Sequence, residues 1–296
     1  MIKAEVILDS LHPSRSSRLT TLRVTFPRYL LPEFNTHRAF SRNSASTRAI
    51  PLKKFRQTVL DNPAEPAFWG LVGKGMQAHG PMPLAKANWA RRLWRGLRYP
   101  ACAVHWVLEK LGASKETASR LLEPWAHSVV LVTATDAGWS NFLTLRNHPA
   151  ADPTLQAVAQ AVAKSIAESH PILLNIGGWH LPFSNPQTDV RGWLKTAQIQ
   201  SVARCARVSY ATPDQPHRES QMVEDAALYQ RLVGSDPKHC SPAEHQACAV
   251  PMFATGQGNF GPDSGWGQFR KMLDGESQGN MFRGPDGYII GYGPGE

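Results

Sequence analysis

An alternating pattern near the start of the chain constrains the fold most. Residues 19–26 place Leu22, Val24 and Phe26 on every second position, a period typical of a strand with one buried face. Residues 4–10 form a second strand-like stretch, joined to the first by a turn region rich in Pro, Ser and Arg. The pattern predicts two strands of one sheet on the N-terminal side of the protein.

The rest of the chain is mostly helical in pattern. Residues 53–112 have a helical pattern that is interrupted by Pro and Gly. Ser114 is a suitable N-cap for the next helix. Residues 155–166 are alanine-rich, which also predicts a helix. Residues 129–133 suit a buried strand, although so short an apolar run also fits a helix. The glycine-dense segment beyond residue 256 predicts loops around a short helix at 266–273. Together these patterns predict an α+β fold, with an antiparallel sheet flanked by helices.

The amino-acid composition restricts the class of protein less than the strand and helix patterns do. A hydrophobic content of 42% is normal for a globular core, and no apolar run approaches the length of a membrane span. The first residues lack the layout of a signal peptide, and the four cysteines show no paired metal-ligand spacing, so a reducing cytoplasm is the expected compartment. A formal charge of +9 suits an enzyme with polyanionic ligands and a nucleic-acid binder equally well.

Residues 36–48 concentrate chemistry that suits an anion. Arg38, Arg42 and Arg48 lie in a segment that is rich in hydroxyl side chains, contains Asn43 and has no carboxylate. Like charges repel, so an external anion would stabilise such a cluster, and guanidinium and hydroxyl groups match phosphate oxygens in geometry. We call residues 36–48 the cradle and expect it to bind a nucleotide phosphate. A solvated basic face at a helix end explains the same residues without any ligand.

Two further blocks carry polar groups at close spacing. The second block holds Arg120 and the segment Asn141-Phe142-Leu143-Thr144-Leu145-Arg146, and a core helix with Arg146 pointing outward is the simpler reading of it. The third block holds residues 205–210 and residues 239–245, where Pro242 can open a helix whose start would favour an anion. A capped helix with a polar first turn needs no ligand.

The three blocks together resemble the signature segments of the flavin-dependent thymidylate synthases. Residues 37–48 are similar to that family's His-Arg-x-x-Ser-x-Asn-x-x-Ser-x-Arg pattern, residues 141–146 to its Asn-Phe-Leu-x-Leu-Arg segment, and residues 205–210 with 239–245 to a pair of segments that normally comes first. Here that pair comes last, as expected of a circular permutation. The resemblance implies one domain over residues 1–296, with a helical insertion around 63–106 and a glycine-rich tail at 251–296.

The resemblance also implies roles for individual residues. Arg146, Ser46 and Arg48 would act in catalysis, with Arg146 polarising a pyrimidine carbonyl. The same three residues and Arg120 would bind the nucleotide. The flavin would be bound by His37, Arg38, Ser41, Asn43, Asn141, Ser209, His239, Ser241, Glu244 and His245.

The implied reaction is the methylation of dUMP at C5 to give dTMP. It uses FAD, with NADPH and methylenetetrahydrofolate as co-substrates, in sites that the family builds between the subunits of a homotetramer. Cys205 and Cys240 would be packing residues rather than nucleophiles. A zinc site at His239, Cys240, His245 and Cys248 matches no common spacing, so no metal is expected.

Several positions depart from the family pattern and leave alternatives open. The family usually has an arginine where this chain has Thr36, a glutamate at Ser44, a tyrosine at Ala49 and a glutamine at Glu33. Arg42 could replace the cation that is missing at Thr36. Another pyrimidine nucleotide, or a hydroxymethyl product, is therefore a close alternative. A more distant one is a nucleic-acid-binding protein that stacks bases on Trp89, Trp94 and Trp106, although we expect those tryptophans in the core.

Overall fold

The computed structural model describes residues 1–75, 77–184, 193–208, 222–252, 258–261, 264–273, 280–283 and 289–293. Its centre is a five-stranded sheet in the order β3-β4-β2-β1-β5, antiparallel except for the parallel pair β1 and β5. The strands are β1 (Lys3–Leu11), β2 (Arg18–Pro27), β3 (Ser41–Ser44), β4 (His127–Thr135) and β5 (Ile172–Leu173). The strands expected from residues 4–10, 19–26 and 129–133 are confirmed as β1, β2 and β4.

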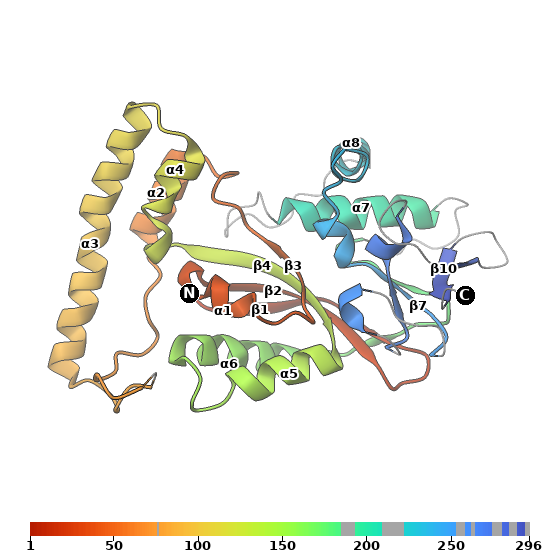
Figure 1. Ribbon diagram of the computed structural model, residues 1–296, viewed down its shortest axis with the longest axis horizontal. Coiled ribbons are helices and arrows are strands. Elements are labelled where there is room, and N and C mark those ends of the chain that lie inside the picture. Colours follow the sequence, from red (N-terminus) through yellow and green to blue (C-terminus); the bar gives the residue numbers. More distant parts are fainter. Residues whose placement is uncertain are drawn as a thin grey trace.

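Two helices, α5 (Asp136–Arg146) and α6 (Pro153–Ala167), cover one face of this sheet (Figure 1). The alternation in β2 turns Leu22, Val24 and Phe26 toward them, where all three are fully buried. Side chains from both helices, among them Phe142 and Leu155, complete this core. Each helix begins at a capping side chain, Thr135 for α5 and Asp152 for α6.

The other face carries α7 (Trp193–Arg207) and a smaller antiparallel sheet. Val129 and Leu131, which alternate with the residues facing α5 and α6, pack with Cys205 on this side. The smaller sheet has the order β6-β7-β8, formed by β6 (Trp179–His180), β7 (Ala247–Ala249) and β8 (Trp266–Gln268), and α8 (Met222–Val233) packs on α7. The helix expected at 266–273 is therefore wrong in its first part: β8 comes first, followed by the short 3-10 helix η5 (Phe269–Met272).

Three helices form a separate layer beside the sheet. They are α2 (Leu52–Asp61), α3 (Leu84–Lys110) and α4 (Lys115–Arg120), and α3 stands at the outer edge of the molecule (Figure 1). A cluster that includes Phe55, Cys102 and Leu122 holds this layer together. The expectation that the tryptophans of α3 are core residues is wrong for Trp89 and Trp106, which are 63% and 49% exposed.

The remaining elements are short. They are η1 (Arg28–Leu30), α1 (Leu31–Phe34), η2 (Glu123–Trp125), η3 (Ser241–Glu244), η4 (Gly258–Phe260) and the antiparallel pair β9 (Asn280–Arg283) and β10 (Ile289–Gly293). The α+β class with a mostly antiparallel sheet is thus confirmed. Of the helices in the described ranges, none has both the length and the apolar character that crossing a membrane requires.

Candidate functional site

The cradle lies at an edge of the main sheet. The chain leaves α1, turns through residues 35–40 and enters β3, which pairs only with β4 in the sheet order. Ser41 is opposite Thr133 and Ser44 is opposite Val130 in this pairing. An edge strand leaves one row of backbone groups unpaired by the sheet, so β3 can present both side chains and backbone to a neighbour.

His37 is buried at the turn and meets the second block directly. Its ring packs against Phe40 and Phe142, with centroids 5.6 Å and 5.0 Å away. Arg146 donates a hydrogen bond from Nε to His37 Nε2 at 3.0 Å, and one from Nη2 to Thr36 Oγ1 at 3.3 Å. Burial first, and then the charges of Arg146 and Arg42, lower the pKa of His37 to about 4. His37 is therefore neutral near pH 7 and accepts a hydrogen bond from Arg146.

Arg42 stabilises the turn at residues 35–40 through hydrogen bonds to its backbone. Its Nη1 donates to the carbonyl oxygens of Asn35 at 3.0 Å and His37 at 2.7 Å. Burial lowers the pKa of Arg42, while Glu244 acts in the opposite direction. This guanidinium is engaged with backbone, so its predicted role as a replacement cation for the nucleotide stays a prediction.

The third block closes over β3 from the other face of the sheet. Asn43 Nδ2 donates to the carbonyl oxygen of Cys205 at 2.9 Å. Gln268 Nε2 donates to Ser41 Oγ at 2.9 Å and to the carbonyl oxygen of Glu244 at 3.0 Å. Burial raises the pKa of Glu244 even though its carboxylate pairs with Arg270. The second and third blocks therefore both contact the cradle, the second at Thr36 and His37 and the third at Asn43 in β3.

A buried polar chain runs beneath this junction. Thr133 Oγ1 is 2.9 Å from His245 Nδ1 and 2.6 Å from Thr21 Oγ1, which in turn is 2.7 Å from His180 Nε2. Burial lowers the pKa of both histidines to about 3, so both are neutral. His245 Nε2 is buried and has no partner among the described residues. Sequence reasoning found only His245, because the other members lie in separate segments with no local pattern.

The predicted nucleotide-binding residues are divided: Arg146 lies beside His37, whereas Arg48 and Arg120 lie near α4. Arg48 lies 3.7 Å from Glu116 in α4, and Arg120 lies 3.2 Å from Glu123. Glu123 also pairs with Arg28, whose Nη1 donates to the carbonyl oxygen of Ala45 next to Ser46. Among the described residues, the contacts of Arg48 and Arg120 tie them to the α4 region rather than to His37 and Arg146.

Other predicted residues are less engaged. Asn141 is exposed on α5, and His239 and Ser241 are exposed around η3. Arg38 is exposed too, and no described residue forms a hydrogen bond or ion pair with it. The α-helix expected after Pro242 is wrong: η3 is a 3-10 helix of four residues, too short to offer an aligned anion-binding terminus. Ser209 lies outside the described residues.

Among the residues that the structure describes, the cysteines and possible metal ligands form no separate site. Cys205 and Cys240 are both buried, and burial raises the pKa of the Cys205 thiol. Both features suit the packing role that was expected, since a nucleophile needs an accessible thiolate. Within the described ranges, no three His, Cys, Asp or Glu side chains group in a way that could hold a metal ion.

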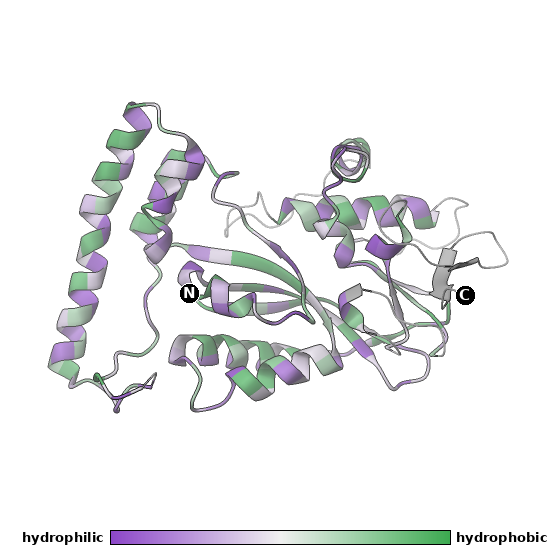
Figure 2. Ribbon diagram, in the orientation of Figure 1, coloured by the Kyte–Doolittle hydropathy of each residue, from purple (hydrophilic) through white to green (hydrophobic). Residues whose placement is uncertain are grey.

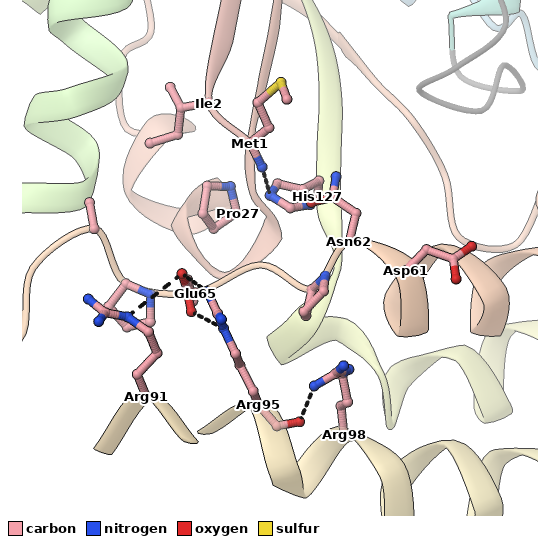
Figure 3. Close-up of a pocket in the computed structure, with 13 residues that line it drawn as sticks. Met1, Ile2, Pro27, Asp61, Asn62, Glu65, Arg91, Arg95, Arg98 and His127 are labelled. Atoms are coloured by element: carbon pink, nitrogen blue, oxygen red, sulfur yellow. Dashed lines mark hydrogen bonds and ion pairs between the residues drawn. The ribbon is translucent and has the colours of Figure 1, made fainter. Parts of the chain in front are cut away.

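A cleft of about 550 Å³ lies elsewhere, between α3 and the first residues of the chain (Figure 3). Arg91, Arg95 and Arg98 reach into it from successive turns of α3. Glu65 binds Arg95 through two hydrogen bonds of 2.7 Å and 2.8 Å and lies 3.9 Å from Arg91. His127, at the start of β4, also lines the cleft, whereas β3 of the cradle pairs with residues 130–133 of that strand. The cleft and the predicted site share no residue.

Comparison with known proteins gives a limited likeness. No family model matches the chain, and no curated protein matches its sequence. Among solved structures, it is similar to a UMP/dUMP methylase PolB from Streptomyces cacaoi bound with 5-Br dUMP (TM-score 0.44, 18% identity, 53% of this chain and 68% of that chain). A structure of the same enzyme bound with 5-Br UMP gives a TM-score of 0.48, 17% identity, and coverage of 58% and 90%. At such scores and identities the likeness carries no argument about what this chain binds.

Proposed function

We propose that this protein is a flavin- and folate-dependent enzyme that methylates dUMP at C5. One observation carries the proposal: the second and third blocks, which lie more than 50 residues away from the cradle and from each other along the sequence, both contact the cradle. His37 contacts Arg146 of the second block, and Asn43 contacts the third block at Cys205. A basic surface loop with no ligand has no need of such convergence.

The residues at this junction suit a flavin nucleotide. Arg38 is an exposed cation beside the buried His37 and is free to meet a phosphate. His245 Nε2 is a buried polar atom without a described partner, and such an atom costs free energy unless a ligand or water satisfies it. We propose that Arg38, His37 and His245 hold the cofactor, together with Ser41, Asn43 and Glu244.

The chain's own residues would position and polarise the pyrimidine. The flavin, when bound, supplies electrons that it obtains from NADPH, and methylenetetrahydrofolate supplies the carbon. Arg146, oriented by His37, would donate hydrogen bonds to a ring carbonyl and stabilise negative charge as it develops there. No thiolate from this chain is needed for that role.

The split of the predicted residues suggests how the site is completed. Ser46, Arg48 and Arg120 lie toward α4, at the other end of β3 from Arg146. We propose that the nucleotide phosphate is held by this second group from another copy of the chain, in an oligomer such as a homotetramer. Each site would then need residues of two copies.

A specific observation keeps the choice of pyrimidine open. Thr36 and Glu33, two positions that depart from the family pattern, both contact Arg146. They are therefore placed to influence which ring Arg146 accepts, and a different pyrimidine nucleotide is the second candidate substrate.

The absorbance spectrum of the purified protein tests the proposal. We expect flavin bands that change when dUMP is added, and labelled one-carbon transfer from methylenetetrahydrofolate in the presence of NADPH. Parallel assays with dCMP separate the second candidate. A protein that neither retains nor binds added FAD would refute the flavin assignment, and a colourless protein that binds DNA with a steep salt dependence would favour the nucleic-acid alternative.

A further inference from the structure

The cleft beside α3 is lined by more positive than negative side chains. Arg91, Arg95 and Arg98 line it together with Glu65 and Asp61, so its guanidinium groups outnumber its carboxylates by one. Glu65 pairs with Arg95 and lies near Arg91, and no arginine in the described part of the chain forms an ion pair with Asp61. Like charges that converge on one volume repel, so an anion from outside would stabilise this lining.

Arg98 is the cation of the cleft that has no carboxylate partner among the described residues. Its Nη1 donates to the carbonyl oxygen of Arg95 at 2.6 Å, and its Nη2 donates to the phenol oxygen of Tyr99 at 2.8 Å. Its Nε is buried, and no described group accepts a hydrogen bond from it. Neutral acceptors leave the charge of Arg98 uncompensated, and a buried donor without an acceptor costs free energy. An anion that enters the cleft therefore gains most at Arg98.

Direct contacts hold the two walls of the cleft together. Trp94 of α3 donates from Nε1 to the carbonyl oxygen of Ala64 at 2.8 Å. The ion pair between Arg95 and Glu65 joins the same two segments. The three arginines are spaced by four and three positions, so they extend from one face of α3 into the cleft (Figure 3). Walls that are fixed before a ligand arrives lose less conformational entropy when it binds.

The other lining residues indicate an organic ligand. Ile2, Pro27, Pro63 and Pro66 supply apolar surface to the cleft, and its volume of about 550 Å³ is within the range of small-molecule sites. Burial lowers the pKa of His127 to about 4, so this ring is neutral near pH 7 and adds no charge to the lining. The cleft thus combines a cationic side with an apolar side.

The number of acceptors favours a phosphate monoester over a carboxylate. A carboxylate has two oxygens, and Glu65 already presents both of its oxygens to Arg95. A phosphate monoester has three terminal oxygens and a charge of about −1.5 to −2 at neutral pH. It can therefore pair with Arg98 while Arg95 stays paired with Glu65, and guanidinium groups match phosphate oxygens in geometry.

We propose that this cleft binds a small organic phosphate monoester, with the phosphate on Arg98 and the organic part against the apolar side. Arg91 and Arg95 are shared between the phosphate and Glu65. The site is separate from the cradle and shares no residue with it. The inference therefore goes beyond the proposed enzymatic activity and does not depend on it.

Calorimetric titration of the full chain with phenyl phosphate tests the site. We expect saturable binding, and weaker binding of inorganic phosphate, which leaves the apolar side unfilled. Arg98→Gln should weaken the binding of phenyl phosphate by about 10-fold or more, since a charged hydrogen-bond donor is lost. Arg92→Gln is the matched control: it removes the same charge from the same helix, but Arg92 is exposed, does not line the cleft and lies over the ring of Trp89. It should leave the affinity unchanged.

Glu65→Gln tests the competition for the arginines with the opposite sign. Removing the carboxylate frees Arg95, so phenyl phosphate should bind about 3- to 5-fold more tightly. Circular dichroism confirms that each variant is folded. If the arginines serve only to tie α3 to Glu65, folded Glu65→Gln will not bind phenyl phosphate more tightly, and the proposal is wrong. Absence of saturable binding to the wild-type chain, or equal affinity of the wild type and Arg98→Gln, would also overturn it, because a phosphate bound in the cradle is insensitive to Arg98.

Discussion

At the scale of single residues, the site depends on one contact between distant parts of the chain. Arg146 reaches His37 with its Nε and Thr36 with a terminal nitrogen, so its fork is oriented by two acceptors. Because burial and the neighbouring arginines keep His37 neutral, the ring can accept this hydrogen bond at neutral pH. The guanidinium is thereby held in place before any ligand arrives.

Replacing Arg146 by Lys tests this orientation. Lysine keeps the charge but lacks the rigid fork and the Nε donor, so we expect kcat/KM for the proposed reaction to fall by about 10- to 100-fold. Arg231→Lys, at an exposed position on α8, is the control and should retain full activity. Steady-state kinetics with dUMP measures both. An Arg146→Lys enzyme as active as the wild type would remove Arg146 from the proposed mechanism.

At the scale of elements, the sheet is fixed by helices that begin at well-defined caps. Asp152 Oδ1 accepts hydrogen bonds from the backbone N–H groups of Thr154 and Leu155, both at 2.9 Å. The helix that follows, α6, buries Leu155, Val158 and Val162 against the sheet. The cap therefore sets where the helix that supports β1 and β2 starts.

Removing this cap should destabilise the protein measurably. We expect Asp152→Ala to lower the free energy of unfolding by about 1–2 kcal/mol, since two backbone donors lose their acceptor. Glu168→Ala removes a carboxylate at the other end of the same helix, where the exposed ion pair with Lys164 is 3.8 Å long. That control should change stability by less than about 0.5 kcal/mol. Chemical denaturation compares them, and equal losses would contradict the capping argument.

At the scale of the whole molecule, the two sheets are joined through buried polar groups. His180 of the smaller sheet contacts Ser10 of β1 and Thr21 of β2, and His245, which follows η3, contacts Thr133 of β4. Both histidines must stay neutral, because a protonated ring in this position would bring an unpaired charge into the core.

Stability should therefore fall in acid. Burial lowers the pKa of His180 and His245 to about 3, whereas both titrate near 6.5 when unfolded. As far as these two groups are concerned, the free energy of unfolding is highest above pH 6.5 and falls as the pH is lowered toward 3. Over that range only the unfolded chain binds the protons, so protonation favours unfolding. Relative to pH 7, each histidine should lower the free energy of unfolding at pH 5 by about 2 kcal/mol. Denaturation between pH 7 and 5 measures this.

A variant separates the histidines from other acid-sensitive groups. His180→Gln should reduce the dependence of stability on pH over this range, whatever its effect at pH 7. His79→Gln, at an exposed position, should leave that dependence as in the wild type. If His180→Gln and the wild type lose stability equally between pH 7 and 5, buried neutral histidine is not the cause.

Features that depend on local pattern could be predicted from the sequence. The period-two alternation identified β2, the apolar run identified β4, and Ser114 marked the start of α4. Trp266 to Gln268 could not be recognised as a strand, because it becomes one only by pairing with β7, about twenty residues away. The burial of Trp89 was also misjudged, since its helical neighbours are apolar on the outer face as well.

The sequence by itself determined which groups are available: three blocks that together supply Arg, His, Ser and Asn side chains. Figure 2 shows how polar and apolar residues are distributed over the fold. Only the tertiary structure decided that His37 meets Arg146, that Asn43 meets Cys205, and that Arg48 and Arg120 turn toward α4. The reason is physical. Side-chain type follows from the chain alone, whereas a contact between residues 37 and 146 depends on how β2, β4 and α5 pack between them.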